Sequence, residues 1–219
     1  MEYDCILPTR RNFILAAGLL TLAPCIWAQS PNGSTSNILV LGDSLSAEYG
    51  IRRDSGWVGL VQQRLSQSNL PYTMRNASVS GDTTSAGLSR LPAALQRHQP
   101  SIVILALGSN DALRGLPLEM TQANLEKMMA LSREAGAVPV LVGMRMPPNY
   151  GRSYAEAFAS MYDTLAQNQQ APLIPFLLEG VATRPELFQP DQMHPTEEAQ
   201  PIIADNVWTV LNTVLKRQP

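Results

Sequence analysis

Two short polar blocks of this sequence carry the residue types that nucleophilic acyl transfer requires. Ser44 follows Gly42 and Asp43, and Asp191 and His194 stand three residues apart in a second block near the C-terminus. A serine attacks an acyl carbonyl when a histidine removes its proton and a carboxylate orients that histidine. These residues therefore predict the hydrolysis of acyl esters or thioesters, with Ser44 as nucleophile, His194 as base and Asp191 as the orienting carboxylate.

The choice of base is narrow because the chain has only two histidines. His98 stands among polar residues at the expected end of a helix, and we interpret it as a solvated surface residue. His194 precedes Pro195, which favours an extended backbone at His194 and can begin a helix itself. We therefore expect His194 in a loop at a helix start, where Asp191 can bind one ring nitrogen and Ser44 the other.

Donors for the oxyanion of a tetrahedral intermediate are available in two further blocks. Gly81 offers an unhindered backbone N–H, and Asn110 offers a side-chain amide. Together with the N–H of Ser44, these groups could stabilise the negative charge on the attacked oxygen. Each residue also has a structural explanation, because Asn110 could form an Asx turn and Gly81 could be needed only for a positive φ.

Continuous apolar runs separate these blocks from one another. A short apolar run without alternation is typical of a strand buried on both faces, as in a parallel sheet. Segments with helical spacing of apolar residues lie between the runs, and Pro92 should mark the start or a kink of one helix. The alternation predicts one domain, residues 37–219, folded as a right-handed, doubly wound α/β sandwich of three layers, α/β/α. We expect central strands at 37–42, 101–108 and 138–144, outer strands at 73–79 and 173–176, and helices near 57–65, 88–95, 125–131 and 195–215.

The polar blocks lie at the ends of the expected strands or next to the last expected helix. Ser44, Gly81 and Asn110 each follow an expected strand, and Asp191 and His194 precede the last helix. Ligands of open α/β sheets bind at the carboxyl ends of the strands. We therefore expect these five residues to meet at one edge of the sheet.

In their order along the chain, Ser44, Gly81, Asn110 and His194 resemble the four motif residues of the SGNH (GDSL) hydrolases, with Asp191 completing the last block. The resemblance covers residues 38–219, and residues 37–219 would form a single SGNH hydrolase domain. The bacterial branch of thioesterase I/protease I/lysophospholipase L1, which includes arylesterases, is similar to this chain at residues 76–83, 113–115, 148–152, 154–158 and 199–205.

The resemblance implies a flavodoxin-like fold with a five-stranded parallel sheet and a periplasmic, cofactor-free enzyme without a metal. Acyl thioesters, aryl esters and lysophospholipids would be its substrates. Ser109 and Ala112 depart from the family pattern, because glycine is usual at both positions; the changes stiffen the backbone and bear on loop mobility and acyl-chain preference. The resemblance also implies a mobile loop at 112–117 beside an acyl groove lined by Leu113, Met144, Arg145, Met146 and Pro147.

The N-terminal segment has the pattern of an export signal. Arg10 and Arg11 precede an apolar run that extends to about Trp27, and cleavage after Ala28 would suit the small residue there. The paired arginines fit either a Sec signal or a twin-arginine signal, and residues 22–25, which end at Cys25, are a weak match to a lipoprotein processing site. We expect residues 1–28 to be removed, residues 29–36 to form a short flexible leader, and the mature protein to be periplasmic or secreted without a stable membrane span.

Composition excludes some partners. The chain of 219 residues has a formal net charge of −2 and no run of Lys and Arg, so we expect no nucleic-acid surface. Both cysteines, Cys5 and Cys25, lie in the expected signal, so the mature protein would have no thiol chemistry. A monomer is the simpler expectation for the oligomeric state.

Two other functions use the same residues. Asp43, Asp82 and Asp111 all follow expected strands and could hold Mg²⁺ in a metal-dependent phosphoesterase. The same three carboxylates could instead cap helices and brace turns. An exported binding protein for a lipid or a sugar could use the same cleft without catalysis.

Overall fold

The computed structural model describes residues 35–217. The expected export signal, residues 1–28, lies outside the described residues, and only the last two residues of the expected leader lie inside them. The predicted single domain falls within one compact unit, Ser34–Pro219.

A parallel sheet of five strands forms the centre of the domain, in the order β2-β1-β3-β4-β5. This order places the first strand of the chain inside the sheet and sends later strands outward on either side, as the doubly wound fold requires. The predicted fold class is confirmed. The strands are β1 (Ser36–Gly42), β2 (Tyr72–Asn76), β3 (Pro100–Ala106), β4 (Val138–Val142) and β5 (Leu173–Ile174).

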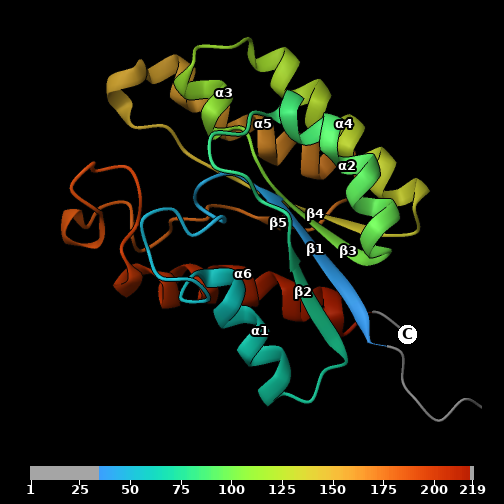
Figure 1. Ribbon diagram of the computed structural model, residues 1–219. Coiled ribbons are helices and arrows are strands. Elements are labelled where there is room, and N and C mark those ends of the chain that lie inside the picture. Colours follow the sequence, from blue (N-terminus) through green and yellow to red (C-terminus); the bar gives the residue numbers. More distant parts are fainter. Residues whose placement is uncertain (1–34, 218–219) are drawn as a thin grey trace, which may run out of the picture. The chain divides into compact units, whose positions relative to one another are not determined.

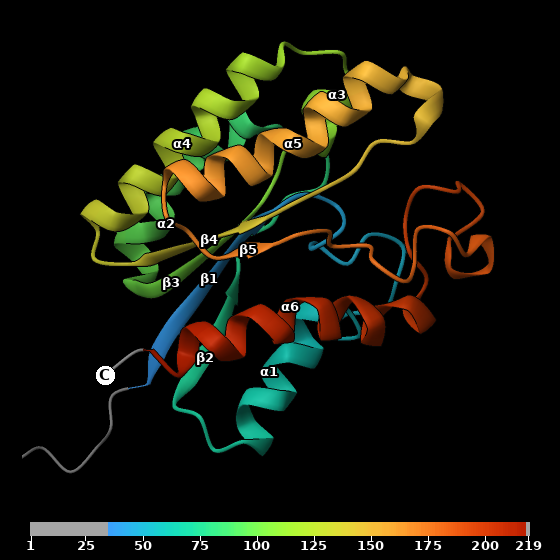
Figure 2. The same ribbon diagram turned by 180° about the vertical axis from the view of Figure 1, so that it is seen from behind.

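Helices cover both faces of the sheet, as Figures 1 and 2 show from opposite sides. One face carries α1 (Trp57–Gln67) and α6 (Gln200–Leu215), which contact each other. The other face carries α2 (Thr84–His98), α4 (Leu118–Glu134) and α5 (Arg152–Asn168). The short helix α3 (Ser109–Leu113) follows β3, and three 3₁₀ turns, η1 (Pro148–Tyr150), η2 (Pro185–Leu187) and η3 (Glu197–Ala199), lie in the connections.

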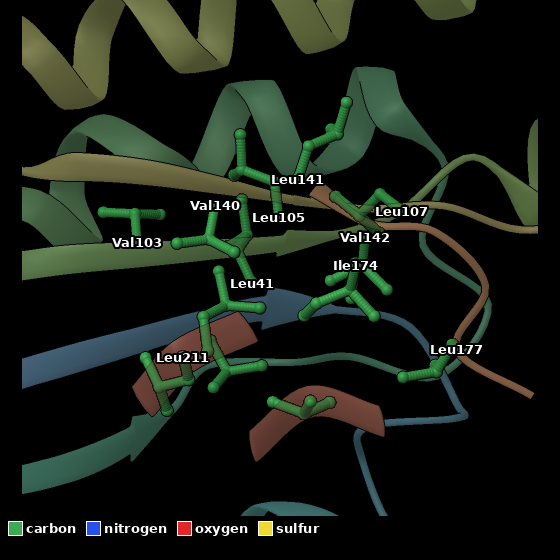
Figure 3. Packing of buried hydrophobic residues seen from close by; sticks show 14 of the residues in the cluster. Leu41, Val103, Leu105, Leu107, Val140, Leu141, Val142, Ile174, Leu177 and Leu211 are labelled. Atoms are coloured by element: carbon green, nitrogen blue, oxygen red, sulfur yellow. The ribbon is translucent and has the colours of Figure 1, made fainter. Parts of the chain in front are cut away.

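The core explains why the apolar runs do not alternate. Leu41, Val103, Leu105 and Leu141 are fully buried, and Figure 3 shows strand side chains packed on both sides of the sheet. Because helices cover both faces, successive residues of a central strand enter the core from opposite sides. Among the described helices, none is long and apolar enough to cross a bilayer.

Several element bounds differ from the predictions. The strand expected at 101–108 ends at Ala106, and the strand expected at 173–176 has only two residues. Of the two positions predicted for Pro92, a helix start or a kink, the helix start is wrong, because Pro92 lies inside α2. The last helix was expected to begin at Pro195, which is wrong: Pro195 forms an antiparallel bridge with Phe188, and α6 begins at Gln200.

Candidate active site

Ser44 lies in a run of turns, residues 44–50, that directly follows β1. The backbone N–H groups of Ser46 and Ala47 both donate to the carbonyl of Asp43, at 3.1 and 2.9 Å, which bends the chain sharply around Ser44. A Cβ at Gly42 would lie 2.8 Å from Oγ of Ser46, so this tight turn requires glycine before it. The turn places Ser44 at the carboxyl end of a central strand.

His194 and Asp191 reach Ser44 from a loop that precedes α6. Figures 1 and 2 show the segment after β1 and the segment before α6 at the same end of the sheet. Nε2 of His194 lies 2.9 Å from Oγ of Ser44, and Nδ1 of His194 lies 2.6 Å from Oδ2 of Asp191. The structure therefore brings the three predicted residues into one chain of hydrogen bonds, in the order that a proton transfer from serine to histidine requires.

The carboxylate of Asp191 is held mainly by its own loop. Its Oδ1 accepts the backbone N–H of His194 at 3.0 Å and that of Met193 at 2.9 Å. The N–H of His194, followed by its imidazole and the N–H of Met193, lowers the pKa of Asp191 to about 2. Asp191 is therefore ionised at neutral pH and can stabilise a positive charge on the imidazole.

Gly81 and Asn110 stand at the ends of the neighbouring connections. Gly81 has φ +84°, in the left-handed region that favours glycine, and its carbonyl accepts Nη2 of Arg114 at 2.8 Å. Nδ2 of Asn110 donates to the carbonyl of Asp82 at 3.0 Å, so the Asn110 side chain is tied to the segment that carries Gly81. Both residues line the same cavity as Ser44 and His194.

The cavity has a volume of about 720 Å³ and a wall that is mostly apolar. All five residues predicted for the acyl groove line it, which brings together side chains from α3 and from the segment after β4. Residues that the sequence did not single out line it as well. These are mainly aromatic and aliphatic side chains from the irregular segments around the site: Tyr49, Tyr150, Phe176, Leu178, Ala182, Pro185, Phe188 and Met193.

Asp43 is the buried charge of the site. The residue is 2% exposed, and burial raises its pKa from 3.8 to about 6, against the lowering effect of the Leu45 N–H and of nearby His194. Oδ1 accepts the N–H of Leu45 at 3.0 Å, and Oδ2 lies 3.4 Å from Nδ2 of Asn110. Asp43 thus connects the turn around Ser44 to the amide of Asn110.

The three carboxylates of the metal hypothesis have separate partners. Asp82 forms an ion pair with Arg90. Asp111 is buried and accepts the N–H and the hydroxyl of Thr84, at 2.8 and 2.5 Å. Within residues 35–217, no group of three or more His, Cys, Asp or Glu side chains could hold a metal ion. In the described domain these aspartates brace turns and helix ends, which was the structural alternative.

His98 lies away from the cavity, at the last position of α2. Its carbonyl accepts Nδ2 of Asn37 at 2.7 Å, which places it beside the amino end of β1, at the edge of the sheet opposite Ser44. Burial, with a smaller contribution from Arg97, lowers the pKa of His98. Nothing in this position connects it to acyl transfer.

The comparisons with known proteins agree with this architecture. Residues 40–201 match the model of the GDSL-like Lipase/Acylhydrolase family. The esterase TesA of Pseudomonas aeruginosa is 41% identical over 202 residues, which are 92% of this chain and 98% of the relative. Thioesterase 1/protease 1/lysophospholipase L1 of Escherichia coli K12 is 42% identical over 172 residues, 78% of this chain and 81% of the relative.

A solved structure extends the comparison to three dimensions. The psychrotrophic esterase EstA from Pseudoalteromonas sp., in a structure inhibited by monoethylphosphonate, superposes with a TM-score of 0.79 at 36% identity, covering 83% of this chain and 100% of that one. The chain therefore belongs to the GDSL-like lipase/acylhydrolase family, and the family predicted from the motifs is confirmed, together with its thioesterase I-like branch. The predicted class of protein, a hydrolytic enzyme, is confirmed as well.

Proposed function

We propose that this protein hydrolyses acyl esters and acyl thioesters, with Ser44 as nucleophile and His194 as general base. Asp191 orients the imidazole of His194 and stabilises its positively charged form. The observation that carries the proposal is the hydrogen-bond chain from Oγ of Ser44 through His194 to Asp191, with distances of 2.9 and 2.6 Å, at the wall of an apolar cavity. A serine with this pairing can act as a nucleophile at neutral pH.

The reaction runs in two halves. In the first half, Oγ of Ser44 attacks the acyl carbonyl carbon while Nε2 of His194 takes its proton, and the charged imidazole then gives that proton to the leaving alcohol or thiol. In the second half, His194 takes a proton from water, which attacks the acyl group on Ser44. The carboxylic acid leaves, and the proton returns to Oγ of Ser44.

The oxyanion formed in each half needs hydrogen-bond donors. We assign this role to the backbone N–H groups of Ser44 and Gly81 and to Nδ2 of Asn110. Three observations support the assignment: both residues line the cavity of Ser44, Gly81 has a positive φ, and the Asn110 amide is fixed by its hydrogen bond to the carbonyl of Asp82. Loss of one such donor costs about 10²- to 10³-fold in kcat.

The cavity supports a substrate with an apolar acyl chain. Its wall includes Leu113, Met144, Met146 and Phe176, and Met side chains adapt to chains of different shape. The names of the relatives, an esterase and a thioesterase/lysophospholipase, support esters, thioesters and lysophospholipids as the substrate class. Ala112 lies inside α3 and is 2% exposed, so the expected loop 112–117 begins within a helix, and its mobility is part of the proposal.

The setting of the enzyme is proposed on the sequence alone. Residues 1–28 would direct export, and the mature protein would work as a periplasmic or secreted enzyme without a cofactor. A monomer suffices for the proposed reaction, because Ser44, His194, Asp191, Gly81 and Asn110 all come from one chain.

A substrate panel with two inhibitors tests this function. The purified mature protein should hydrolyse p-nitrophenyl esters and acyl-thioesters, keep its activity in a chelator, and lose it to a p-nitrophenyl phosphonate that adds once to Ser44. Activity that a chelator abolishes and a phosphonate spares would indicate a metal-dependent phosphoesterase instead. Tight binding of acyl lipids or sugars without turnover would indicate a binding protein.

A further inference from the structure

Two loops meet at the site and are tied together by polar contacts. We call residues 43–56 the nucleophile loop, because it carries Ser44, and residues 188–199 the base loop, because it carries Asp191 and His194. One tie is the ion pair of Arg52 with Glu197, at 2.8 Å, to which the backbone N–H of Arg52 adds a hydrogen bond of 2.9 Å. These contacts lie outside the cavity that contains Ser44, at the far end of the two loops.

The tie nearest the site runs through Gln189. Its Nε2 donates to the carbonyl of Tyr49 in the nucleophile loop, at 2.8 Å, and to the carbonyl of Pro195 in the base loop, at 3.1 Å. Its backbone N–H donates to the carbonyl of His194 at 2.8 Å. One glutamine therefore bonds to the base itself, to the residue after it and to the nucleophile loop.

The close approach of Gln189 depends on Gly50. A Cβ at Gly50 would lie 2.1 Å from Oε1 of Gln189, and Gly50 has φ +71°. Both observations require glycine at this position, because a side chain would be strained and would displace the carboxamide. The nucleophile loop is thus shaped to receive the side chain of Gln189.

The ring of Tyr49 lies against the imidazole of His194. The ring centroids are 4.3 Å apart and the planes are tilted by 36°. Tyr49 is 51% exposed, so its contact with His194 is not explained by burial in the core. A ring in this position restricts the rotation of the imidazole between Ser44 and Asp191.

We propose that Gln189 is a positioning residue that acts through Tyr49: its carboxamide holds the Tyr49 ring against His194 and so keeps the imidazole aligned with Ser44. The proposal rests on the function proposed above. Gln189 itself touches no reacting atom, and Tyr49 contributes its ring to the contact with His194. Alignment of the base with its nucleophile is sensitive to small displacements, so loss of the clamp should reduce the rate of chemistry.

A double-mutant cycle tests the proposal. The variants are Gln189→Ala, Tyr49→Ala and the double variant, each assayed with p-nitrophenyl acetate and for the rate at which a small phosphonate adds to Ser44. The short acyl group limits the effect of groove contacts on KM. Each single variant should lose about three- to tenfold in kcat and in phosphonylation rate, and the double variant should be no slower than Tyr49→Ala alone, because the two residues act in series.

Two conservative variants separate positioning from folding. Tyr49→Phe keeps the ring and the backbone carbonyl, so it should lose clearly less rate than Tyr49→Ala. Gln189→Glu keeps the size of the side chain but removes both donated hydrogen bonds, and it should lose rate as Gln189→Ala does, in a protein that keeps a native circular dichroism spectrum. A role in folding alone would not predict a loss of rate in folded Gln189→Glu, or a larger loss of rate in folded Tyr49→Ala than in Tyr49→Phe.

Three results would overturn the proposal. These are wild-type rates in folded Gln189→Ala and Gln189→Glu, equal losses in Tyr49→Phe and Tyr49→Ala, or losses that multiply in the double variant. Failure of the proposed function looks different, because the wild-type protein would then neither hydrolyse the ester nor react with the phosphonate.

Discussion

Asp191 and His194 form two hydrogen bonds with each other, one through the backbone and one through the side chains. The N–H of His194 donates to Oδ1 of Asp191 at 3.0 Å, while the imidazole Nδ1 lies 2.6 Å from Oδ2. The same carboxylate therefore shapes the loop and orients the base. Because the two functions use different oxygen atoms, a substitution that keeps one oxygen acceptor can separate them.

Asp191→Asn is the substitution that makes this separation. The amide oxygen can still accept the loop N–H groups, while the amide nitrogen faces Nδ1 of His194 and favours the wrong tautomer. We expect a loss of about 10²- to 10⁴-fold in kcat with a native circular dichroism spectrum. A folded Asp191→Asn protein with nearly wild-type kcat would contradict the role given to Asp191.

Asp43 should make stability depend on pH. Its folded pKa of about 6 lies above the ordinary value of 3.8, so its contribution to stability is present below about pH 4 and is lost as the pH rises through 6. The loss amounts to about 3 kcal/mol. Asp43→Asn keeps an acceptor for the Leu45 N–H and cannot ionise, so its stability relative to the wild type should improve by that amount between about pH 4 and pH 7.

Urea unfolding of both proteins across this range measures the difference. Other carboxylates titrate in the same range in both proteins and cancel in the comparison. A constant difference between wild type and Asp43→Asn at every pH would show that Asp43 has an ordinary pKa.

Gly81 and Gly136 form a matched pair for testing the oxyanion donor. Both have positive φ, +84° and +79°. Among the described residues, a Cβ would have room at each: Nη2 of Arg114 would lie 3.8 Å from a Cβ at Gly81, and no atom would lie within 4 Å of a Cβ at Gly136. Alanine at either position should cost about 1 kcal/mol of stability through backbone strain. Only Gly81→Ala should also reduce kcat, by about tenfold or more, because the strain shifts an N–H that we assign to the oxyanion. Equal kcat in the two variants would remove Gly81 from the site.

Asp111 should be important for stability, since its carboxylate joins the start of α2 to α3. Removal of this fully buried side chain leaves the N–H and the hydroxyl of Thr84 without their acceptor. We expect Asp111→Ala to lower the free energy of unfolding by about 2–4 kcal/mol. Asp163→Ala, on an exposed position of α5, should stay within about 0.5 kcal/mol. Denaturant unfolding of the two variants gives the comparison.

The pairing of Ser44 with His194 was predictable for two physical reasons. The apolar runs identified buried parallel strands, whose carboxyl ends must share one edge, and the chain offered only one histidine near such an edge. The same reasoning led to Gly81 and Asn110. The expected export signal lies outside the described residues and stays a prediction.

The rest of the cavity wall and the contacts between the loops were not predictable from periodicity. Phe176 and Phe188 lie in the irregular connection between β5 and α6, where no repeat indicates which side chains face the cavity. Pro195 carries a helix-start signal, yet its pairing with Phe188 holds the base loop extended until α6 begins at Gln200. The roles of Tyr49 and Gln189 arise from contacts between loops about 140 residues apart in sequence, which no local pattern reveals.

The most direct test of the account is turnover of a p-nitrophenyl acyl ester by Ser44→Ala, measured beside Ser46→Ala. Ser46 is a buried serine of the same turn, and its Oγ has no hydrogen-bond partner among the described residues. We predict that Ser44→Ala loses about 10⁵-fold or more in kcat while Ser46→Ala stays within about twofold of the wild type, both with native melting temperatures. Turnover by folded Ser44→Ala at a rate close to that of the wild type would contradict the assignment of Ser44 as the nucleophile.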